Sequence, residues 1–205
     1  MKSVSVFDYG VGNILALTSS LSKVFDRVYT ISEIGQIAEF DCNHLVLPGV
    51  GAAESAMRNI DSKEFHKTFH EHSNLKILGI CLGMQLLAEF SEEGNGVETL
   101  GLIRGTTRRL ESNDVGIVPR IGWYRVRQTI REKGAQESLL RGIADESFFY
   151  FAHSFSVTRP DISNVDSVTD YQIVSSISID RLFGVQFHPE RSGDLGLKVL
   201  SNFSN

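Results

Sequence analysis

The chain has 205 residues, of which 41% are hydrophobic, and this suffices for one substantial core, so we expect a single domain over residues 1–205. A formal net charge of -5 and the lack of basic clusters argue against nucleic-acid binding. The sequence has neither a charged leader before an apolar run nor about 18 consecutive apolar residues, so we expect neither secretion nor membrane insertion.

Strand-like and helix-like segments alternate in the first half of the chain. The predicted strands are residues 4–8, 28–31, 44–47 and 76–80, and the predicted helices are residues 13–25, 54–59, 64–72 and 83–90. This alternation is typical of an α/β fold with an open, mostly parallel sheet and helices on both faces, as in flavodoxin-like proteins.

The pattern changes from about residue 101 onward to short β-rich runs. These runs are residues 106–110, 123–126, 148–151 and 173–179, and a final helix is predicted over 196–203. The runs predict antiparallel strands that extend or cover the parallel sheet. No repeat and no linker rich in Pro, Gly or Ser divides the chain.

The first glycine-rich turn is Gly10-Val11-Gly12-Asn13, directly after the first predicted strand. It resembles part of a dinucleotide-binding fingerprint. The third glycine and the distal acidic residue of that fingerprint are missing, so we interpret the segment as a tight strand-to-helix turn.

A cysteine lies at the apex of the turn that follows the strand at 76–80. The segment from Gly79 to Gly83 reads Gly-Ile-Cys-Leu-Gly, and small residues on both sides let a substrate come close to the apex. Unpaired N–H groups at the start of the next helix favour a thiolate. The pattern predicts that Cys81 is a nucleophile, although a cysteine taken alone is commonly a small buried hydrophobe.

A second segment supplies the groups that such a nucleophile needs. An apolar run from Leu182 ends in His188-Pro189-Glu190. A thiol needs a base to take its proton, and the base needs an acceptor that fixes its tautomer. Residues i and i+2 of an extended segment point the same way, so we predict that His188 is the base and Glu190 its acceptor. By itself His-Pro-Glu would indicate a solvated strand end.

The two cysteines, Cys42 and Cys81, do not form a disulfide framework, and we expect a reducing, cytoplasmic setting. Cys42 has no motif around it and is interpreted as structural. His66 and His70 have the spacing of a ligand pair, but they lack Cys or carboxylate partners at metal spacing, so no metal is predicted.

Two motifs together resemble the signature pair of the class I glutamine amidotransferases: Gly79-Ile80-Cys81-Leu82-Gly83-Met84-Gln85 and Gly184-Val185-Gln186-Phe187-His188-Pro189-Glu190. Within that superfamily the chain is most similar to the glutaminase subunits of imidazole glycerol phosphate synthases. The similarity runs nearly end to end, through Asp8-Tyr9-Gly10-Val11-Gly12-Asn13, Leu47-Pro48-Gly49-Val50-Gly51, Tyr150-Phe151-Ala152-His153-Ser154 and Arg191-Ser192-Gly193.

The resemblance implies hydrolysis of glutamine without a cofactor. Cys81 would attack the side-chain amide, His188 would protonate the leaving nitrogen with Glu190 behind it, and water would resolve the glutamyl thioester. The loop after the third strand would supply an oxyanion hole from the amides around Val50 and Gly51.

The amide of Leu82 would complete that oxyanion hole, because backbone N–H groups must aim at the developing negative oxygen. Gln85, and Ser154 and Phe155 through their backbone, match the substrate-binding residues of the family. The alternatives for these residues are a helix-surface amide at Gln85 and a strand terminus at Ser154.

The resemblance also implies a partner, since the family passes ammonia through a channel to a (β/α)8-barrel synthase that makes imidazole glycerol phosphate and an aminoimidazole carboxamide ribotide. Arg120, Trp123 and Tyr124 lie in the segment that matches the family's interface. Trp123 is the only tryptophan, and tryptophan is common both as an interface anchor and in cores. The family usually has His where this chain has Arg120, and Asn where it has Tyr124, which alters the docking contacts.

Two alternatives stay open. One is a paralogous glutaminase that feeds a different synthase, such as one for nitrogen-bearing bacterial surface sugars. The other is a non-catalytic scaffold that kept the fold, which the joint presence of Cys81, His188 and Glu190 disfavours.

Overall fold

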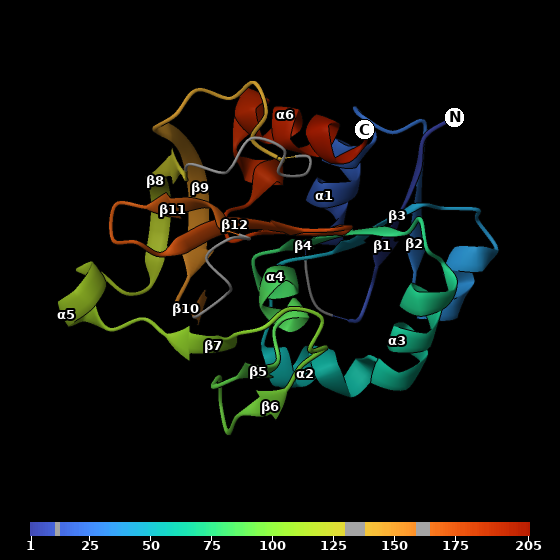
Figure 1. Ribbon diagram of the computed structural model, residues 1–205, viewed down its shortest axis with the longest axis horizontal. Coiled ribbons are helices and arrows are strands. Elements are labelled where there is room, and N and C mark those ends of the chain that lie inside the picture. The colour runs from blue at the N-terminus through green and yellow to red at the C-terminus, as the bar shows by residue number, and fades with distance from the viewer. Residues whose placement is uncertain (11–12, 130–137, 159–164) are drawn as a thin grey trace.

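The structure of the chain is a computed structural model, and it describes residues 1–10, 13–129, 138–158 and 165–205 (Figure 1). Val11 and Gly12 of the first glycine motif lie outside the described residues. Among those that are described, no helix is long and apolar enough to cross a membrane.

The elements fall into two sheets and two sets of helices. The larger sheet contains β1 (Ser3–Phe7), β2 (Arg27–Ile31), β3 (His44–Leu47), β4 (Lys76–Ile80), β8 (Arg120–Gln128), β9 (Ser147–His153), β11 (Val165–Thr169), β12 (Val174–Ile179) and β13 (Leu182–Val185). The smaller sheet contains β5 (Phe90–Ser91), β6 (Val97–Glu98), β7 (Thr106–Arg109) and β10 (Phe155–Thr158). The helices are α1 (Ile14–Leu21), α2 (Ala53–Asn59), α3 (Ser62–Glu71), α4 (Leu82–Leu87), α5 (Ser112–Val115) and α6 (Gly193–Phe203), with short 3-10 helices η1 (Ile34–Ala38) and η3 (Pro189–Arg191).

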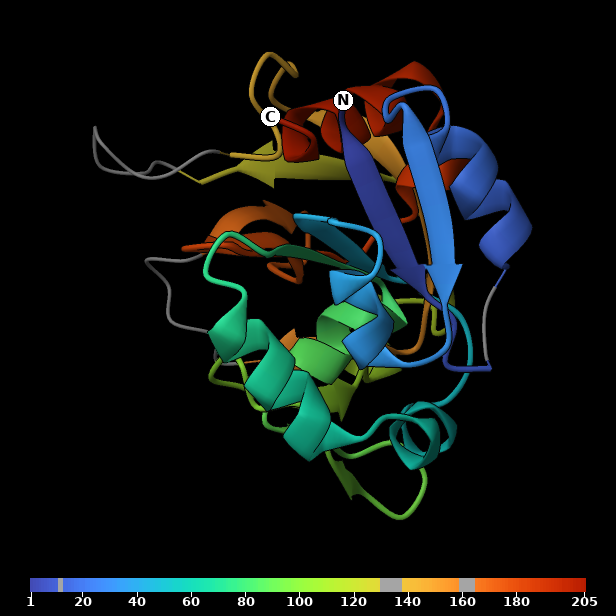
Figure 2. The same ribbon diagram turned by 90° about the vertical axis from the view of Figure 1, so that its right-hand side faces the viewer.

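The larger sheet has the order β2-β1-β3-β4-β13-β12-β11-β8-β9. Its first five strands are parallel to one another, and the rest pair antiparallel. Helices α1 and α6 cover one face, while α2, α3 and α4 cover the other (Figure 1 and Figure 2). The predicted α/β class is therefore confirmed, including the antiparallel strands that extend the sheet.

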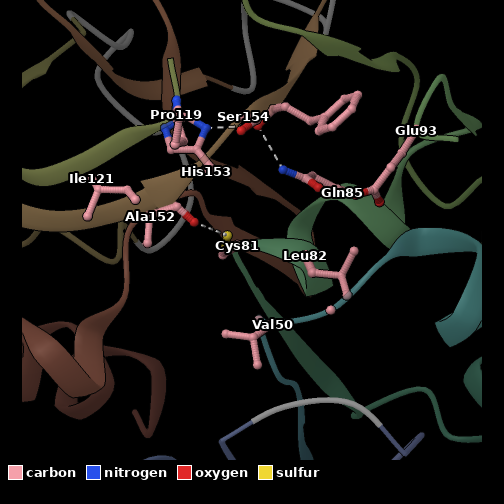
Figure 3. A pocket seen from close by; sticks show the side chains of 13 residues that line it. Val50, Cys81, Leu82, Gln85, Glu93, Pro119, Ile121, Ala152, His153 and Ser154 are labelled. Atoms are coloured by element: carbon pink, nitrogen blue, oxygen red, sulfur yellow. Dashed lines mark hydrogen bonds between the residues drawn. The ribbon is translucent and has the colours of Figure 1, made fainter. Parts of the chain in front are cut away.

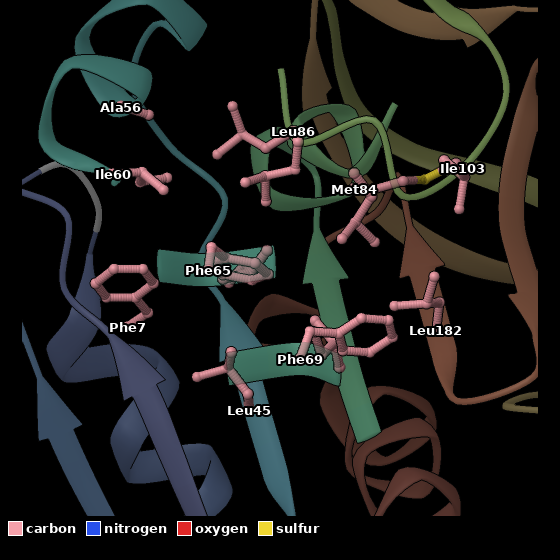
Figure 4. Packing of buried hydrophobic residues seen from close by; sticks show 14 of the residues in the cluster. Phe7, Leu45, Ala56, Ile60, Phe65, Phe69, Met84, Leu86, Ile103 and Leu182 are labelled. Carbon is pink, nitrogen blue, oxygen red and sulfur yellow. The ribbon is translucent and has the colours of Figure 1, made fainter. Parts of the chain in front are cut away.

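Two apolar cores form because alternate side chains of each strand point to opposite faces. On β3, Leu45 and Leu47 belong to the core beneath α2, α3 and α4, whereas Val46 belongs to the core beneath α1 and α6. Figure 4 shows Phe65 and Phe69 of α3 over the first of these cores. Burial of a side chain such as Phe65 contributes about 2 kcal/mol.

Two predicted helices are shorter than the sequence suggested. The helix predicted over residues 83–90 ends at Leu87, because the carbonyl groups of Leu86 and Leu87 accept backbone N–H groups of Leu100 and Leu102 instead of continuing the helix. Phe90 then enters the smaller sheet as part of β5. The helix predicted over 13–25 is α1, which ends at Leu21.

Close packing around β4 explains the glycines of the cysteine motif. Strand β4 pairs in parallel with β13 so that Gly79 lies opposite Gly184. A Cβ on Gly184 would stand 2.7 Å from Cγ of Met84, and one on Gly83 would stand 2.1 Å from the carbonyl oxygen of Leu47. These glycines let α4 lie directly on the ends of β3, β4 and β13.

We predict that Gly83→Ala destabilises the fold by about 3 kcal/mol, because the new Cβ overlaps a backbone carbonyl that cannot move aside. The measurement is the free energy of unfolding in urea. Gly35→Ala is the control, since its Cβ would meet only the tip of the flexible Glu64 side chain. Equal losses in the two variants would contradict this account.

Candidate active site

Cys81 lies at the end of β4 and directly before α4. Its φ of 47° and ψ of -101° are in a region that non-glycine residues rarely occupy. Two backbone hydrogen bonds hold this conformation: Cys81 N donates to Val185 O at 2.7 Å, and Gln85 N donates to Cys81 O at 3.1 Å. Strain of this kind costs about 1–3 kcal/mol and is typical of functional turns.

His188 and Glu190 follow β13, the strand beside β4. The imidazole Nδ1 lies 2.9 Å from Glu190 Oε1, and both side chains are almost wholly buried. The predicted pairing is present, but the predicted extended geometry is wrong. Pro189 begins the 3-10 helix η3, and this turn carries the Glu190 carboxylate back to the ring.

The surroundings of His188 favour its protonated form. Burial lowers its pKa, but hydrogen bonding and charge from Cys81 and Glu190 outweigh this effect and raise the pKa to about 10. Its Nε2 atom is buried and has no partner of regular hydrogen-bond geometry in the described part of the chain. The imidazole is therefore fixed on the Glu190 side and incompletely engaged on the Cys81 side.

A cavity of about 260 Å³ opens beside Cys81 (Figure 3), close to the lower limit of about 300 Å³ for small-molecule sites. Its lining includes every residue predicted for the oxyanion hole and for substrate binding: Val50, Gly51, Leu82, Gln85, Ser154 and Phe155. The sequence reasoning missed five other lining residues, namely Glu93, Pro119, Ile121, Ala152 and His153.

The loop after β3 lies against the cysteine turn. A Cβ on Gly49 would stand 2.4 Å from Ile80 O and 3.0 Å from Cys81 Cβ, so only glycine allows this approach. Gly51 has a φ of 118°, which again requires glycine. The buried Tyr9 supports the loop, since its hydroxyl group donates a hydrogen bond to the carbonyl of Pro48.

The amide of Gln85 is buried, so the interpretation of this residue as a helix-surface amide is wrong. Its Nε2 donates to Phe155 O at 2.9 Å, and Figure 3 shows the Gln85 amide nitrogen pointing toward this carbonyl. Nδ1 of His153 lies 2.8 Å from the same carbonyl. Because a carbonyl oxygen only accepts, His153 carries its proton on Nδ1.

Burial lowers the pKa of His153 to about 4, and the nearby Arg120 and His188 also lower it. The imidazole is therefore neutral near pH 7. Its Nε2 atom is a buried acceptor without a partner among the described residues.

Sulfur contacts identify another residue that the sequence reasoning had not singled out. Gln186 Nε2 donates to Cys81 Sγ at 3.4 Å, and the sulfur lies 3.9 Å from Ala152 O. Gln186 lies two residues before His188 in the same motif, and this position next to a candidate base was the sequence feature that could have identified it.

The predicted interface residues differ in exposure. Trp123 is 53% exposed, so it is not a core residue, and Tyr124 is half-buried. Arg120 is only 2% exposed, which corrects its prediction as a surface contact. Its guanidinium group lies 3.9 Å from the ring centroid of Tyr124 and 5.0 Å from that of Tyr171, and it donates to Val115 O. Arg120 supports the exposed surface from beneath.

The sequence matches the family described as glutamine amidotransferase class-I over residues 6–204. The chain is 39% identical to an "Imidazole glycerol phosphate synthase subunit HisH" from Moorella thermoacetica, over 99% of this chain and 94% of that protein. Proteins with the same description from Haemophilus influenzae and Methanocaldococcus jannaschii are 40% and 35% identical, with at least 97% of each chain covered.

Solved structures show the same fold at much lower identity. A structure described as a putative GMP synthase subunit, from Thermoplasma acidophilum, superposes with a TM-score of 0.72 at 18% identity and covers 100% of this chain and 92% of that chain. The PurLQS structure from Thermotoga maritima has a TM-score of 0.70, also at 18% identity, over 98% of this chain and 97% of that chain.

We predict that His153 makes the fold sensitive to acid. Its pKa is about 4 in the folded state and about 6.5 when unfolded, so the unfolded chain binds more protons between these values. The stability that a neutral His153 contributes is complete above about pH 6.5 and is lost as the pH falls toward 4. From pH 7 to pH 5, the wild type should lose about 2 kcal/mol more than His153→Gln.

Urea titrations at the two pH values measure this difference. Burial and Lys76 also lower the pKa of His44 to about 4, but this histidine is present in both proteins and cancels. An identical pH dependence of the two proteins would show that His153 is not the source.

Proposed function

Because the chain belongs to the class I glutamine amidotransferase family, we propose that it hydrolyses glutamine to glutamate and ammonia as the glutaminase subunit of an imidazole glycerol phosphate synthase in histidine biosynthesis. The observation that carries this proposal is the convergence of Cys81, His188 and Glu190 at the carboxyl ends of two adjacent parallel strands, beside a cavity of substrate size. Ligands of open α/β sheets bind at this edge.

In the first half of the reaction, the Cys81 thiolate attacks the side-chain amide carbon of glutamine. The proton of the thiol resides on His188, which its raised pKa favours, with Glu190 stabilising the imidazolium. The tetrahedral intermediate collapses as His188 Nε2 gives its proton to the leaving nitrogen. Ammonia departs, and a glutamyl thioester on Cys81 remains.

In the second half, neutral His188 takes a proton from water, and the hydroxide attacks the thioester carbon. The C–S bond breaks, the thiolate returns and glutamate leaves. We assign stabilisation of both tetrahedral oxyanions to the amides of Val50, Gly51 and Leu82, which line the cavity beside the sulfur. One such donor is typically worth about 3 kcal/mol of barrier.

We assign substrate binding to Gln85, Ser154 and Phe155. Gln85 uses its amide nitrogen on Phe155 O, so its oxygen is the atom free to receive a substrate N–H. Phe155 O accepts hydrogen bonds from both Gln85 Nε2 and His153 Nδ1, and these bonds fix the backbone on this side of the cavity.

We assign the docking face for a (β/α)8-barrel synthase to the exposed side of β8. Trp123 and Ile121 are 53% and 60% exposed, and Ile121 also lines the cavity beside Cys81. Ammonia released at the sulfur would therefore leave toward the partner, where it is incorporated.

We predict that Cys81→Ala lowers glutamine hydrolysis by at least about 10⁴-fold, because removal of a nucleophile disables the whole triad. The complex with the barrel should still use added ammonia, since that reaction bypasses the thiol. The measurements are glutamate release and product formation from ammonium salts. Persistence of glutamine hydrolysis would exclude Cys81 as the nucleophile, and a scaffold without catalysis would release no glutamate even as wild type.

We predict that Trp123→Ala weakens binding to the barrel by about 30-fold, because a tryptophan anchor typically contributes about 2 kcal/mol. Titration of the partner by calorimetry measures this effect. Phe90→Ala is the matched control, since Phe90 is a partly exposed aromatic residue on the smaller sheet. Equal weakening by both variants would mean that β8 is not the docking face.

The alternative synthase partner is favoured by one observation, the buried stack of Arg120 on Tyr124 beneath this face. The family usually has His and Asn at these positions, so the Arg120–Tyr124 stack changes the shape of the surface that β8 presents to a partner. Glutamate release in the presence of each candidate barrel distinguishes the two assignments: the true partner is the one that raises turnover.

A further inference from the structure

Gln186 is completely buried and touches the sulfur of the proposed nucleophile. It follows β13 in the chain, and its backbone N–H donates to Ser175 O at 2.9 Å, which fixes it to β12. Its side chain lies between Gln85 and Cys81. None of the steps assigned above uses this residue.

The orientation of the Gln186 amide follows from its neighbours. The carbonyl of Phe155 can only accept, so the Gln85 atom that meets it is the amide nitrogen. That nitrogen also meets the Gln186 side chain at 3.3 Å, where only an oxygen can receive it. The remaining atom of the Gln186 amide is therefore its NH₂ group, and this group faces Cys81 Sγ.

We propose that Gln186 is a catalytic residue that holds a fixed N–H donor against Cys81 Sγ and stabilises the thiolate, with Gln85 and Phe155 fixing the direction of the donor. This inference rests on the proposed function, because it names a further group on the reacting sulfur. A hydrogen bond to the charged form of a group favours ionisation.

This donor acts against a competing contact. Ala152 O lies 3.9 Å from the sulfur, and a carbonyl oxygen interacts favourably only with the protonated thiol. The Gln186 contact at 3.4 Å is shorter, and it is the one that a thiolate retains. Gln85 therefore has two roles. It lines the cavity, and its hydrogen bond to Gln186 Oε1 orients the Gln186 NH₂ group toward the Cys81 sulfur.

The test is the rate at which iodoacetamide alkylates Cys81, followed by mass spectrometry of the Cys81 peptide between about pH 5 and pH 10, since only the thiolate reacts. Gln186→Met removes the donor and keeps the length of the side chain. We expect it to raise the midpoint of the pH profile by about one pKa unit, in line with the strength of hydrogen bonds to charged groups.

Gln186→Asn is the second variant, because it keeps an amide but withdraws it from the sulfur, and it should shift the midpoint in the same direction. Asn202→Leu is the control. Asn202 is a buried amide on α6 that donates to Leu139 O and Arg141 O rather than to the cavity, so its loss should leave the midpoint unchanged.

A midpoint that stays at the wild-type value in both Gln186 variants would overturn the proposal, as would an equal shift in Asn202→Leu. The readout requires neither glutamine nor a partner. Failure of this inference is therefore distinguishable from failure of the proposed function, which the Cys81→Ala variant tests.

Discussion

The site depends on the parallel pairing of β4 with β13. Ile80 lies opposite Val185, and the Cys81 amide donates to Val185 O at 2.7 Å, so the two strands end together. The chain leaves one strand through Cys81 and the other through the residues that lead to His188. Two groups more than one hundred positions apart are thus brought together by sheet hydrogen bonds, which are far stiffer than loop contacts.

The cavity is lined by residues from both the parallel and the antiparallel part of the larger sheet. Its sulfur side comes from the parallel strands, whereas Ala152 and His153 come from the antiparallel strand β9. Strand β9 pairs with β8 so that Ala152 lies opposite Ile121, two residues before Trp123. Ile121, Trp123 and Ala152 therefore lie on the same face of this strand pair, so the face proposed for docking continues into the wall of the cavity.

The sequence identified the fold class and the site residues whose signal is local. The motif around Cys81 predicts a tight turn flanked by two glycines, Gly79 and Gly83. The structure gives the reason at Gly83, where the carbonyl oxygen of Leu47 leaves no room for a Cβ. The buried state of Arg120 and the end of α4 at Leu87 were not predictable, because both depend on partners distant in the chain. Gln186 was missed because a motif names residues without saying which atoms they face.

The contacts of the sulfur explain how docking could act on the chemistry. In the isolated chain, Cys81 Sγ is held between Gln186 Nε2 and Ala152 O, while His188 Nε2 lacks a regular partner among the residues that the structure describes. Gln186 follows β13 and its backbone N–H donates to Ser175 O of β12, whereas Ala152 belongs to β9, which pairs with β8. If a partner displaced β8 and β9 together, Ala152 O would leave the sulfur, and the thiolate would keep the Gln186 donor and the imidazolium. The coupling needs no long pathway, since a single pair of strands separates Trp123 from the nucleophile.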